Sequence, residues 1–427
     1  MIANLIFDRE TQKALDSVVA DPQIWKARLE DWCNLNTGSR NLEGLQAFLL
    51  KLEDAFKALP GTCVRRPLQP EAIITPQGLA AEQDLSDSLH VIVRPEAPIK
   101  LVLTGHYDTV FPVQSTFQTV RESEPGIVNG PGVADMKGGL WVMLEALKAF
   151  ETLPFRAQLG YEVLLSPDEE IGSPGSAALL HEIGSRSDVG LTYEPALADG
   201  SMSGARKGSG NFSLTVHGKA AHVGRAHHEG RSAIAAAARF VAGLEALNGK
   251  APGVTFNTGK MDGGGPNNVV PDLAVVRFNV RAPDAEAAAW AQAEIDALIG
   301  QYLSGGGVHS HLHGGFSRPP KPRTPAQELV FAQVAAAGKA IGLELVYKDT
   351  GGVCEGNNLA ASGCANVDTL GPRGGLIHSD QEFAILDSFP ERIRLSLAIL
   401  VGYATGQLDA KAPRRLLAQE LGTNPCS

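Results

Sequence analysis

The segment GHYDTV at 105–110 places a histidine and an aspartate two positions apart, directly after an apolar run that begins at Ile99. The run predicts a buried strand, so His106 and Asp108 should project to the same side of an extended backbone. In that arrangement a carboxylate can bond one ring nitrogen while the other ring nitrogen faces a metal ion. The spacing therefore predicts an oriented metal ligand at the carboxyl end of a strand.

Four further segments offer carboxylates or a histidine in similar settings. They are VADMKGG at 133–139, SPDEEIGS at 166–173, TYEP at 192–195 and LIHSD at 376–380. Each alone has an ordinary explanation, such as a helix-capping carboxylate or a solvated turn. Together they supply enough oxygen and imidazole ligands for two divalent ions, so their joint occurrence favours a metal centre.

The residue types suit hydrolysis of an amide bond. Two divalent ions bridged by a carboxylate polarise a carbonyl and acidify a bound water, while a free carboxylate accepts the proton of that water. The adjacent pair Glu169 and Glu170 fits this division, because neighbours on an extended or turning segment point apart. Asp135 lies in a glycine-rich turn before a predicted helix, where its two oxygens can bridge.

Composition limits the class of protein. A chain of 427 residues with 44% hydrophobic residues can bury a large core and is long enough for two domains. The formal charge of −10 gives no basic surface for nucleic acid or an anionic membrane. We find no signal-like start and no long apolar run, and the five cysteines are widely spaced without a CxxC pair. These features predict a cytoplasmic protein with reduced thiols and no membrane partner.

The first half of the chain predicts a sheet covered by helices. Residues up to about 60 have helical spacing of apolar positions, and 139–150 predicts another helix. The segments 100–105, 161–166 and 190–195 are nearly continuous apolar runs, which are typical of parallel strands buried on both faces. The candidate ligands follow the ends of these strands, where open α/β sheets bind their substrates.

Near residue 205 the pattern changes to alternation of apolar and polar residues. The segments 211–222 and 275–281 predict antiparallel strands with one wet face, accompanied by alanine-rich helices at 232–248 and 284–303. The proline-rich segment 318–325 predicts a stiff, extended return linker. After it, we expect a helix at 326–341, the glycine-rich segment 351–363 and a helix at 386–405 to complete the first domain. The predicted division is 1–204, 205–316 and 317–427.

At this point the chain resembles the M20 metallopeptidase family, which includes glutamate carboxypeptidase and the acetylornithine and succinyl-diaminopimelate deacylases. The resemblance rests on motifs in the family's order between about 100 and 385: GHYDTV, GPGVADMKGG, SPDEEIGS, TYEP, GKAAH, NNVVP and LIHSD. It implies an α/β fold: a zinc-peptidase-like catalytic domain, with a mostly parallel sheet and helices on both faces, and an inserted smaller α+β dimerisation (lid) domain. A homodimer is therefore expected.

The resemblance also implies two zinc sites that share one carboxylate. The ligands would be His106, Asp135 and Glu194 for one ion, and Asp135, Glu170 and His378 for the other. Asp108 would orient His106, and Glu169 would be the general base and later the proton donor. Cobalt and manganese are alternatives, because an oxygen-rich ligand set accepts all three metals.

On the substrate side, the resemblance assigns His222 of AAHVG to the active site of the partner subunit. Asn268 and Arg281 would hold a free carboxylate of the substrate, and Gly352 would lie in a glycine-rich substrate loop. Simpler explanations stay open: Arg281 could form a surface ion pair, Asn268 could be a turn residue, and Gly352 could serve backbone freedom.

One departure from the family pattern lies in that loop, where GGVCEG carries Cys354 and Glu355. The longer carboxylate of Glu355 bears on substrate fit but not on the zinc ligands. Cys354 has no base partner in the sequence, which favours a buried thiol over a nucleophile. His309, His311 and His313 alternate along one segment without nearby carboxylates, and a plain edge strand is the preferred interpretation.

The sequence therefore predicts a dinuclear metallopeptidase that cleaves the amide bond of an N-acyl amino acid or short peptide with a free carboxylate. The first alternative is a deacylase of amino-acid biosynthesis that removes an acetyl or succinyl group. A second, non-enzymatic alternative is a catalytically silent metal-binding dimer, against which the presence of Glu169 speaks.

Overall fold

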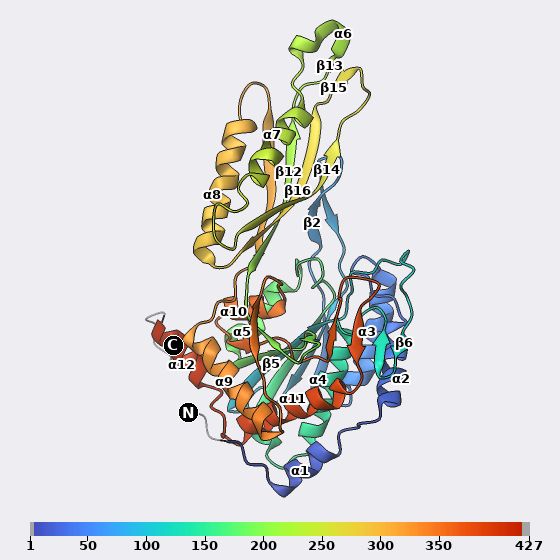
Figure 1. The fold of residues 1–427 in the computed structure, drawn as a ribbon, viewed down its shortest axis with the longest axis vertical. Helices are drawn as coiled ribbons and strands as arrows, with labels where there is room; N and C mark the ends of the chain where they lie inside the picture. The colour runs from blue at the N-terminus through green and yellow to red at the C-terminus, as the bar shows by residue number, and fades with distance from the viewer. Residues whose placement is uncertain (1–3, 421–427) are drawn as a thin grey trace.

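The computed structural model describes residues 4–420, so Cys426 lies outside the described residues. Figure 1 shows a larger body that holds both termini and a narrower unit that projects from it. Within residues 4–420, no helix combines the length and the apolar character needed to cross a membrane. The four cysteines in this range, Cys33, Cys63, Cys354 and Cys364, form no disulfide.

The body is built on a six-stranded sheet with the strand order β1-β4-β8-β5-β9-β19. Four strands are parallel: β5 (Ile99–His106), β8 (Leu159–Ser166), β9 (Val189–Thr192) and β19 (Asn366–Val367). The edge formed by β4 (Ser88–Val93) and β1 (Thr62–Arg66) is antiparallel. The predicted, mostly parallel sheet is confirmed.

Helices cover both faces of this sheet, as expected. Successive residues of β5 alternate between the faces: Leu101 and Leu103 pack into the large core, whereas Val102 packs with Leu180 and Leu359. The large core holds α1 (Arg9–Asp16), α2 (Pro22–Cys33), α3 (Leu42–Phe56), α4 (Lys137–Glu151), α9 (Pro325–Ala340) and α11 (Ser388–Ala404). The other face carries α5 (Ala177–Arg186) and α10 (Glu355–Ala361), and α12 (Ala412–Glu420) packs on α9.

A second sheet of short strands was not predicted. Its order is β10 (Ala196–Leu197), β20 (Arg373–Gly375), β21 (Phe383–Ile385), β7 (Ile127–Asn129) and β6 (Arg121–Glu124). The strands have two to four residues, which is too short for a periodic pattern to identify. This sheet joins the segment before Asp135 to the segment around His378, so it brings distant ligands together.

The projecting unit contains a four-stranded antiparallel sheet with the order β14-β16-β12-β17. Its strands are β14 (Thr255–Gly263), β16 (Leu273–Ala282), β12 (Gly208–His217) and β17 (His309–Arg318). The apolar side of β12, from Phe212 to Val216, packs against α7 (Ala233–Glu245) and α8 (Ala285–Tyr302). The other side carries the polar residues of the alternation and is partly covered, since Thr215 is buried there, and the histidines of β17 lie on an edge strand as interpreted.

The far tip of this unit is a small two-stranded sheet of β13 (Ala221–His222) and β15 (Val269–Val270), followed by α6 (Val223–Ala226) and the 3-10 turn η2 (His227–Glu229). A second 3-10 turn, η1 (Arg156–Gln158), precedes β8 in the body. Near the base, β11 (Met202–Arg206) pairs with β18 (Tyr347–Thr350) where the chain passes between the two parts.

A hairpin of β2 (Glu71–Ile74) and β3 (Ala80–Gln83) rises from the body and lies along the wet face of the projecting sheet (Figure 1). Arg277 of the sheet donates a hydrogen bond to the Ile74 carbonyl oxygen at 2.8 Å, and a ring nitrogen of His313 lies 3.0 Å from the Ala72 carbonyl oxygen. The hairpin therefore links the two parts of the molecule at a second place.

The proline-rich segment 318–325 is a connection between β17 and α9, but it is not a solvated linker. Lys321 is completely buried and donates to Asp368 at 2.7 Å, and Arg206 pairs with the same carboxylate. Burial disfavours the charge of Asp368, but the two cations lower its pKa to about 2. The three side chains anchor both chain crossings of the projecting unit.

The glycine-rich segment 351–363 is not irregular throughout, because α10 occupies residues 355–361. Cys354 is the N-cap of this helix, and its sulfur accepts a hydrogen bond from the Gly356 N–H at 3.3 Å. The glycines obscured the helix in the sequence, since glycine is a poor helix former.

Replacing Asp368 with Asn should destabilise the protein strongly. The change leaves two buried cations without a counter-charge, and breaking a buried ion pair costs roughly 3–5 kcal/mol. We expect a clear fall in the midpoint of urea unfolding. Asp31→Asn is the matched control, because Asp31 pairs with Lys51 at an exposed site. Equal midpoints for the two variants would contradict the anchoring role.

Candidate metal centre

The predicted ligands meet at the carboxyl ends of three neighbouring parallel strands. His106 is the last residue of β5, while Glu169 and Glu170 follow β8 and Glu194 follows β9. Parallel strands end at one edge of a sheet, so side chains that follow them gather in one place. Asp135 reaches the same place from the turn before α4.

One group of converging donors consists of His106, Asp135 and Glu194. Their ligand atoms all lie within 4.8 Å of one another. The His106 Nε2 atom is 3.1 Å from Asp135 Oδ1 and 3.7 Å from Glu194 Oε1. All three residues are buried. This spacing suits a single ion placed between the three donors.

A second group consists of Asp135, Glu170 and His378, again with ligand atoms within 4.8 Å of one another. His378 Nε2 lies 3.3 Å from Asp135 Oδ2 and 3.2 Å from Glu170 Oε2. Asp135 thus directs one oxygen toward each histidine, which is the geometry of a bridging carboxylate. The His378 side chain is 54% exposed, so the second group borders solvent.

Asp108 lies behind His106. Its Oδ1 atom is 3.3 Å from His106 Nδ1, so the other ring nitrogen is directed into the ligand group. The carboxylate of Asp108 also accepts the Ser39 hydroxyl at 2.7 Å and the backbone N–H groups of Glu169 and Glu170 at 3.2 Å. One completely buried carboxylate therefore fixes the positions of His106, Glu169 and Glu170 relative to one another.

The turn that carries Asp135 is held by Glu382. This buried carboxylate accepts the backbone N–H groups of Gly132, Ala134 and Asp135 at 3.0–3.2 Å. Burial and the nearby charge of Asp135 raise the pKa of Glu382 to about 8. Just after the turn, the Lys137 ammonium donates to two carbonyl oxygens of the N-terminal helical region. The backbone on each side of the bridging aspartate is therefore fixed.

The carboxylates of the site repel one another. Burial and repulsion from Asp135 raise the pKa of Glu194 to about 8 and raise the pKa of Glu170 well above its usual range. Hydrogen bonds with the carboxylates of Asp135 and Glu170 raise the pKa of His378 to about 11. An anionic cluster of this kind, with imidazole and carboxylate donors in two groups, fits divalent cations.

Glu169 stands apart from the two groups and is paired with Arg318. The Arg318 guanidinium lies 2.5 Å from Glu169 Oε1 and also donates to the Glu169 carbonyl oxygen and the Ser173 hydroxyl. Glu169 Oε2 is 3.9 Å from His106 Nε2, so its free side faces the first ligand group. The carboxylate is oriented toward the space between the donors.

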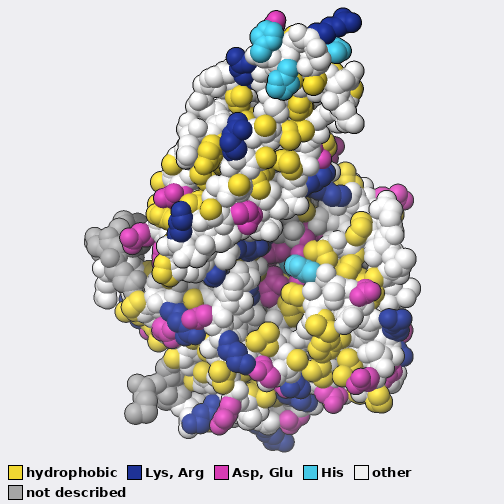
Figure 2. Space-filling view, turned by 45° about the horizontal axis from the view of Figure 1, so that its top comes forward, with side chains coloured by type: hydrophobic (Ala, Val, Ile, Leu, Met, Phe, Trp, Pro, Cys, Tyr) yellow, Lys and Arg dark blue, Asp and Glu magenta, His cyan; other side chains and the backbone are white. Residues whose placement is uncertain are grey.

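The donors open into a hollow of about 810 Å³ between the body and the projecting unit. Figure 2 shows acidic and histidine side chains gathered in this hollow. Arg281 and Gly352, which the sequence analysis proposed as substrate contacts, line this hollow. Arg281 donates to Asn279 at 2.9 Å, whereas the surface ion pair considered for it forms at Arg277, which pairs with Asp262. Burial and the Arg318 cation lower the pKa of Arg281.

Two predicted residues lie away from this hollow. His222 pairs with Val269 in the small sheet at the far tip, and the Asn268 carbonyl oxygen accepts the N–H of Val223 in the same place. Figure 2 shows histidines gathered at this tip. Within one chain, then, His222 and Asn268 are next to each other but remote from the metal ligands.

The unusual loop residues turn into the body. Glu355 is completely buried and accepts a hydrogen bond from the Ser166 hydroxyl, and it does not line the hollow. Burial raises its pKa to about 7. Burial likewise raises the pKa of the Cys354 thiol, as a structural thiol would show. The departure from the family pattern therefore affects the packing around α10 more than the substrate hollow.

Three residues were missed by the sequence analysis: Arg318, Glu382 and Ser39. Arg318 lay in a segment interpreted as a linker from its prolines. Glu382 follows His378 by four positions, and an acidic residue so close to a candidate ligand was an available signal. No pattern in the sequence connects Ser39 to Asp108, which are 69 positions apart.

Comparisons with known proteins agree with this arrangement. A family model described as a peptidase dimerisation domain matches residues 204–306. Carboxypeptidase G2 of Pseudomonas sp. (strain RS-16) is 28% identical over 408 residues, covering 95% of this chain and 93% of its own. The succinyl-diaminopimelate desuccinylase of Alkalilimnicola ehrlichii is 30% identical over 297 residues, covering 65% and 77%.

Solved structures support the fold. An M20 family metallo-carboxypeptidase from Sulfolobus solfataricus superposes with a TM-score of 0.67 at 16% identity, covering 93% of this chain and 100% of that one. The fold and the site together define a hydrolase whose projecting unit matches a peptidase dimerisation domain. The chain belongs to the M20 family of metallopeptidases, as the motifs predicted. It is a metal-dependent hydrolase of amide bonds, and the deacylase alternative is also consistent with these relatives.

Replacing Glu382 with Gln should weaken binding of divalent metal. The amide keeps one acceptor oxygen but turns an N–H₂ group toward backbone donors, so the Asp135 turn loses its clamp. Loss of such an outer contact typically lowers metal affinity roughly 10–100-fold. Titration with Co²⁺, followed by its visible absorption, measures the change. Glu328→Gln at an exposed ion pair is the control and should bind as the wild type; an unchanged affinity for Glu382→Gln would contradict the clamp.

Proposed function

We propose that the protein is a dinuclear amide hydrolase that uses zinc. One ion would be held by His106, Asp135 and Glu194, and the other by Asp135, Glu170 and His378. The observation that carries this proposal is the convergence of five side chains into two groups that share Asp135. Bound divalent ions would polarise the scissile carbonyl and acidify the attacking water.

Residues of the chain carry out the proton transfers and hold the catalytic groups in position. Glu169 accepts the proton of the water and later delivers it to the leaving nitrogen, because its Oε2 atom is 3.9 Å from His106 Nε2 while it belongs to neither ligand group. Arg318 fixes the carboxylate of Glu169 by a direct pair. Asp108 holds His106 in one tautomer and orientation.

The substrate class follows from the lining of the hollow. Arg281 is a cation in a partly buried position that donates to a neutral amide, so it can bind a free carboxylate of the substrate. Gly352 lies in the wall of the same hollow. We therefore assign N-acyl amino acids or short peptides with a free carboxylate, cleaved as by a carboxypeptidase. Removal of an acetyl or succinyl group remains the second candidate, favoured by the desuccinylase relatives.

A homodimer completes the proposal. His222 and Asn268 lie together at the tip and are remote from the ligands of their own chain, so we assign them to the active site of a partner subunit. The dimerisation domain would be residues 205–316, between catalytic parts 1–204 and 317–427. The unpaired cysteines of the described residues suit a reducing, cytoplasmic compartment.

Replacing Glu169 with Gln should abolish turnover and leave the metal content intact. The amide cannot accept the proton of the water, while none of the five ligands is altered. Measurement of kcat together with elemental analysis separates the two effects. If the protein is a catalytically silent metal-binding dimer, the wild type will show no hydrolysis. If the wild type is active and Glu169→Gln has the same rate, the role of Glu169 is ruled out.

Chelation should remove activity, and addition of Zn²⁺, Co²⁺ or Mn²⁺ should restore it. The assay measures release of free amino acid from dipeptides and from N-acetyl and N-succinyl amino acids. Hydrolysis mainly of dipeptides supports the peptidase assignment, whereas preference for acetyl or succinyl substrates supports the deacylase. Activity that survives complete metal removal would contradict both.

A further inference from the structure

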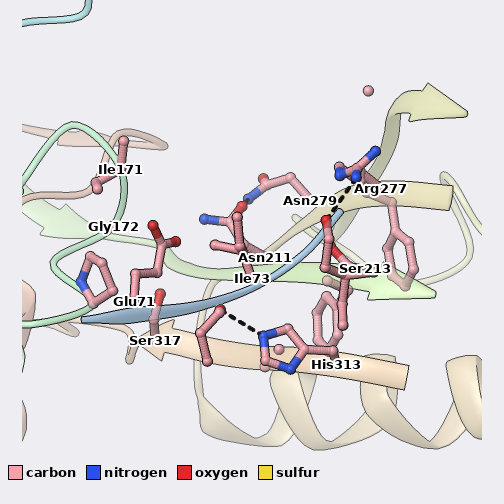
Figure 3. A pocket seen from close by; sticks show the side chains of 18 of the residues that line it. Glu71, Ile73, Ile171, Gly172, Asn211, Ser213, Arg277, Asn279, His313 and Ser317 are labelled. Carbon is pink, nitrogen blue, oxygen red and sulfur yellow. Dashed lines mark hydrogen bonds between the residues drawn. The ribbon is translucent and has the colours of Figure 1, made fainter. Parts of the chain in front are cut away.

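A second hollow of about 790 Å³ lies beside the metal centre, between the β2–β3 hairpin and the wet face of the projecting sheet. We call it the hairpin chamber. Figure 3 shows the side chains that line the chamber, with Glu71 and Ile73 of β2 among the sheet residues Asn211, Asn279 and His313. The volume of the chamber is within the range of sites that hold small organic ligands.

The chamber has apolar surfaces and charges that are already paired. Its apolar lining comes from Pro70, Ala72, Ile73 and Ile74 before and along β2 and from Ile171 and Pro174 in the loop after β8, whereas the sheet contributes the polar side chains of Asn211, Ser213 and Asn279. Arg40 pairs with Glu71, and Arg277 pairs with Asp262. A ligand in this chamber should therefore bind more favourably if it is uncharged and apolar.

The chamber adjoins the metal hollow. Six residues line both spaces: Ile171, Gly172, Asn211, Asn257, Asn279 and Ser317. Ile171 and Gly172 directly follow the candidate ligand Glu170, so the boundary between the two spaces lies next to the candidate ligands. At this boundary a Cβ atom on Gly172 would lie 3.4 Å from Asn211 Nδ2 and 3.5 Å from Ser317 Oγ, so glycine leaves the most room there.

Arg281, Gly352 and His378 line the metal hollow but not the chamber. A substrate whose carboxylate is held at Arg281 and whose amide lies at the candidate ligands can direct its acyl part toward the boundary that the two spaces share. We propose that the hairpin chamber is the acyl subsite of this enzyme and that it selects a bulky, uncharged, apolar acyl group, such as an aromatic acyl, over acetyl. This inference rests on the proposed function and assigns its substrate class.

Gly315 offers a way to fill the chamber without touching the metal centre. It pairs with Asn211 across β12 and β17, so a side chain there would point to the same wet face. A Cβ atom at Gly315 meets nothing within 4 Å, and its backbone is outside the left-handed region. Gly315→Phe should therefore fold and occupy the chamber. Gly300→Phe, on the surface of α8 and equally open, is the matched control.

The test compares N-acetyl and N-(4-phenylbenzoyl) derivatives of one amino acid with the zinc-loaded protein. We expect the wild type to hydrolyse the aromatic derivative with a kcat/KM at least tenfold higher. Gly315→Phe should remove that advantage through a higher KM and leave the acetyl derivative within about twofold, while Gly300→Phe changes neither. Equal rates on the two derivatives in the wild type, or an equal loss on both in Gly315→Phe, would overturn the proposal.

Binding of 4-phenylbenzoate, measured by calorimetry, separates this inference from the proposed function. If neither derivative is cleaved, the proposed function fails, and the chamber still stands if the wild type binds the acid and Gly315→Phe does not. Absence of binding to the wild type overturns the chamber. Should Gly315→Phe not fold, Gly259→Leu narrows the chamber from β14, where a Cβ atom has only ordinary contacts at 3.9 Å.

Discussion

The site depends on mutual repulsion of buried carboxylates. Asp135, Glu169, Glu170 and Glu194 occupy one small, largely dehydrated space, which costs free energy unless positive charge is present. His106, His378 and Arg318 supply part of that charge from the chain itself. The negative charge that these cations leave unbalanced favours the binding of divalent cations. Because the backbone around the carboxylates is fixed, they cannot move apart to reduce their repulsion.

That rigidity comes from side chains that never reach the hollow. Asp108 accepts hydrogen bonds from two segments and Glu382 from a third, so loops that are distant in the sequence are tied to common oxygens. The short second sheet does the same for the backbone before Asp135 and around His378. The candidate ligands come from five segments, and these contacts hold the segments of His106, Asp135, Glu170 and His378 in place.

Much of the fold and of the candidate site could be predicted from the sequence. The apolar run that forms a parallel strand is followed directly by a candidate ligand, and the two patterns together are more specific than either alone. The apolar run before His106 and the alternation around Phe212 gave the two kinds of sheet correctly. The hairpin at 71–83 and the short strands near Asp135 gave no such signal, since strands of two to four residues carry no period. Arg318 and Lys321 were hidden by prolines that suggested solvent, whereas only tertiary contacts reveal that both cations are buried.

Arg318 is the last residue of β17, at the point where the projecting unit returns to the body, and Ser209 pairs with it at the start of β12. A residue at the junction of two parts is displaced least when one part rotates about that junction. Rotation of the projecting unit about this junction would displace His222 at the tip far more than the Arg318 guanidinium beside Glu169, although the hairpin contacts at Ala72 and Ile74 restrain such a rotation. Contact of the tip with a second molecule would therefore leave the ion pair between Arg318 and Glu169 in place.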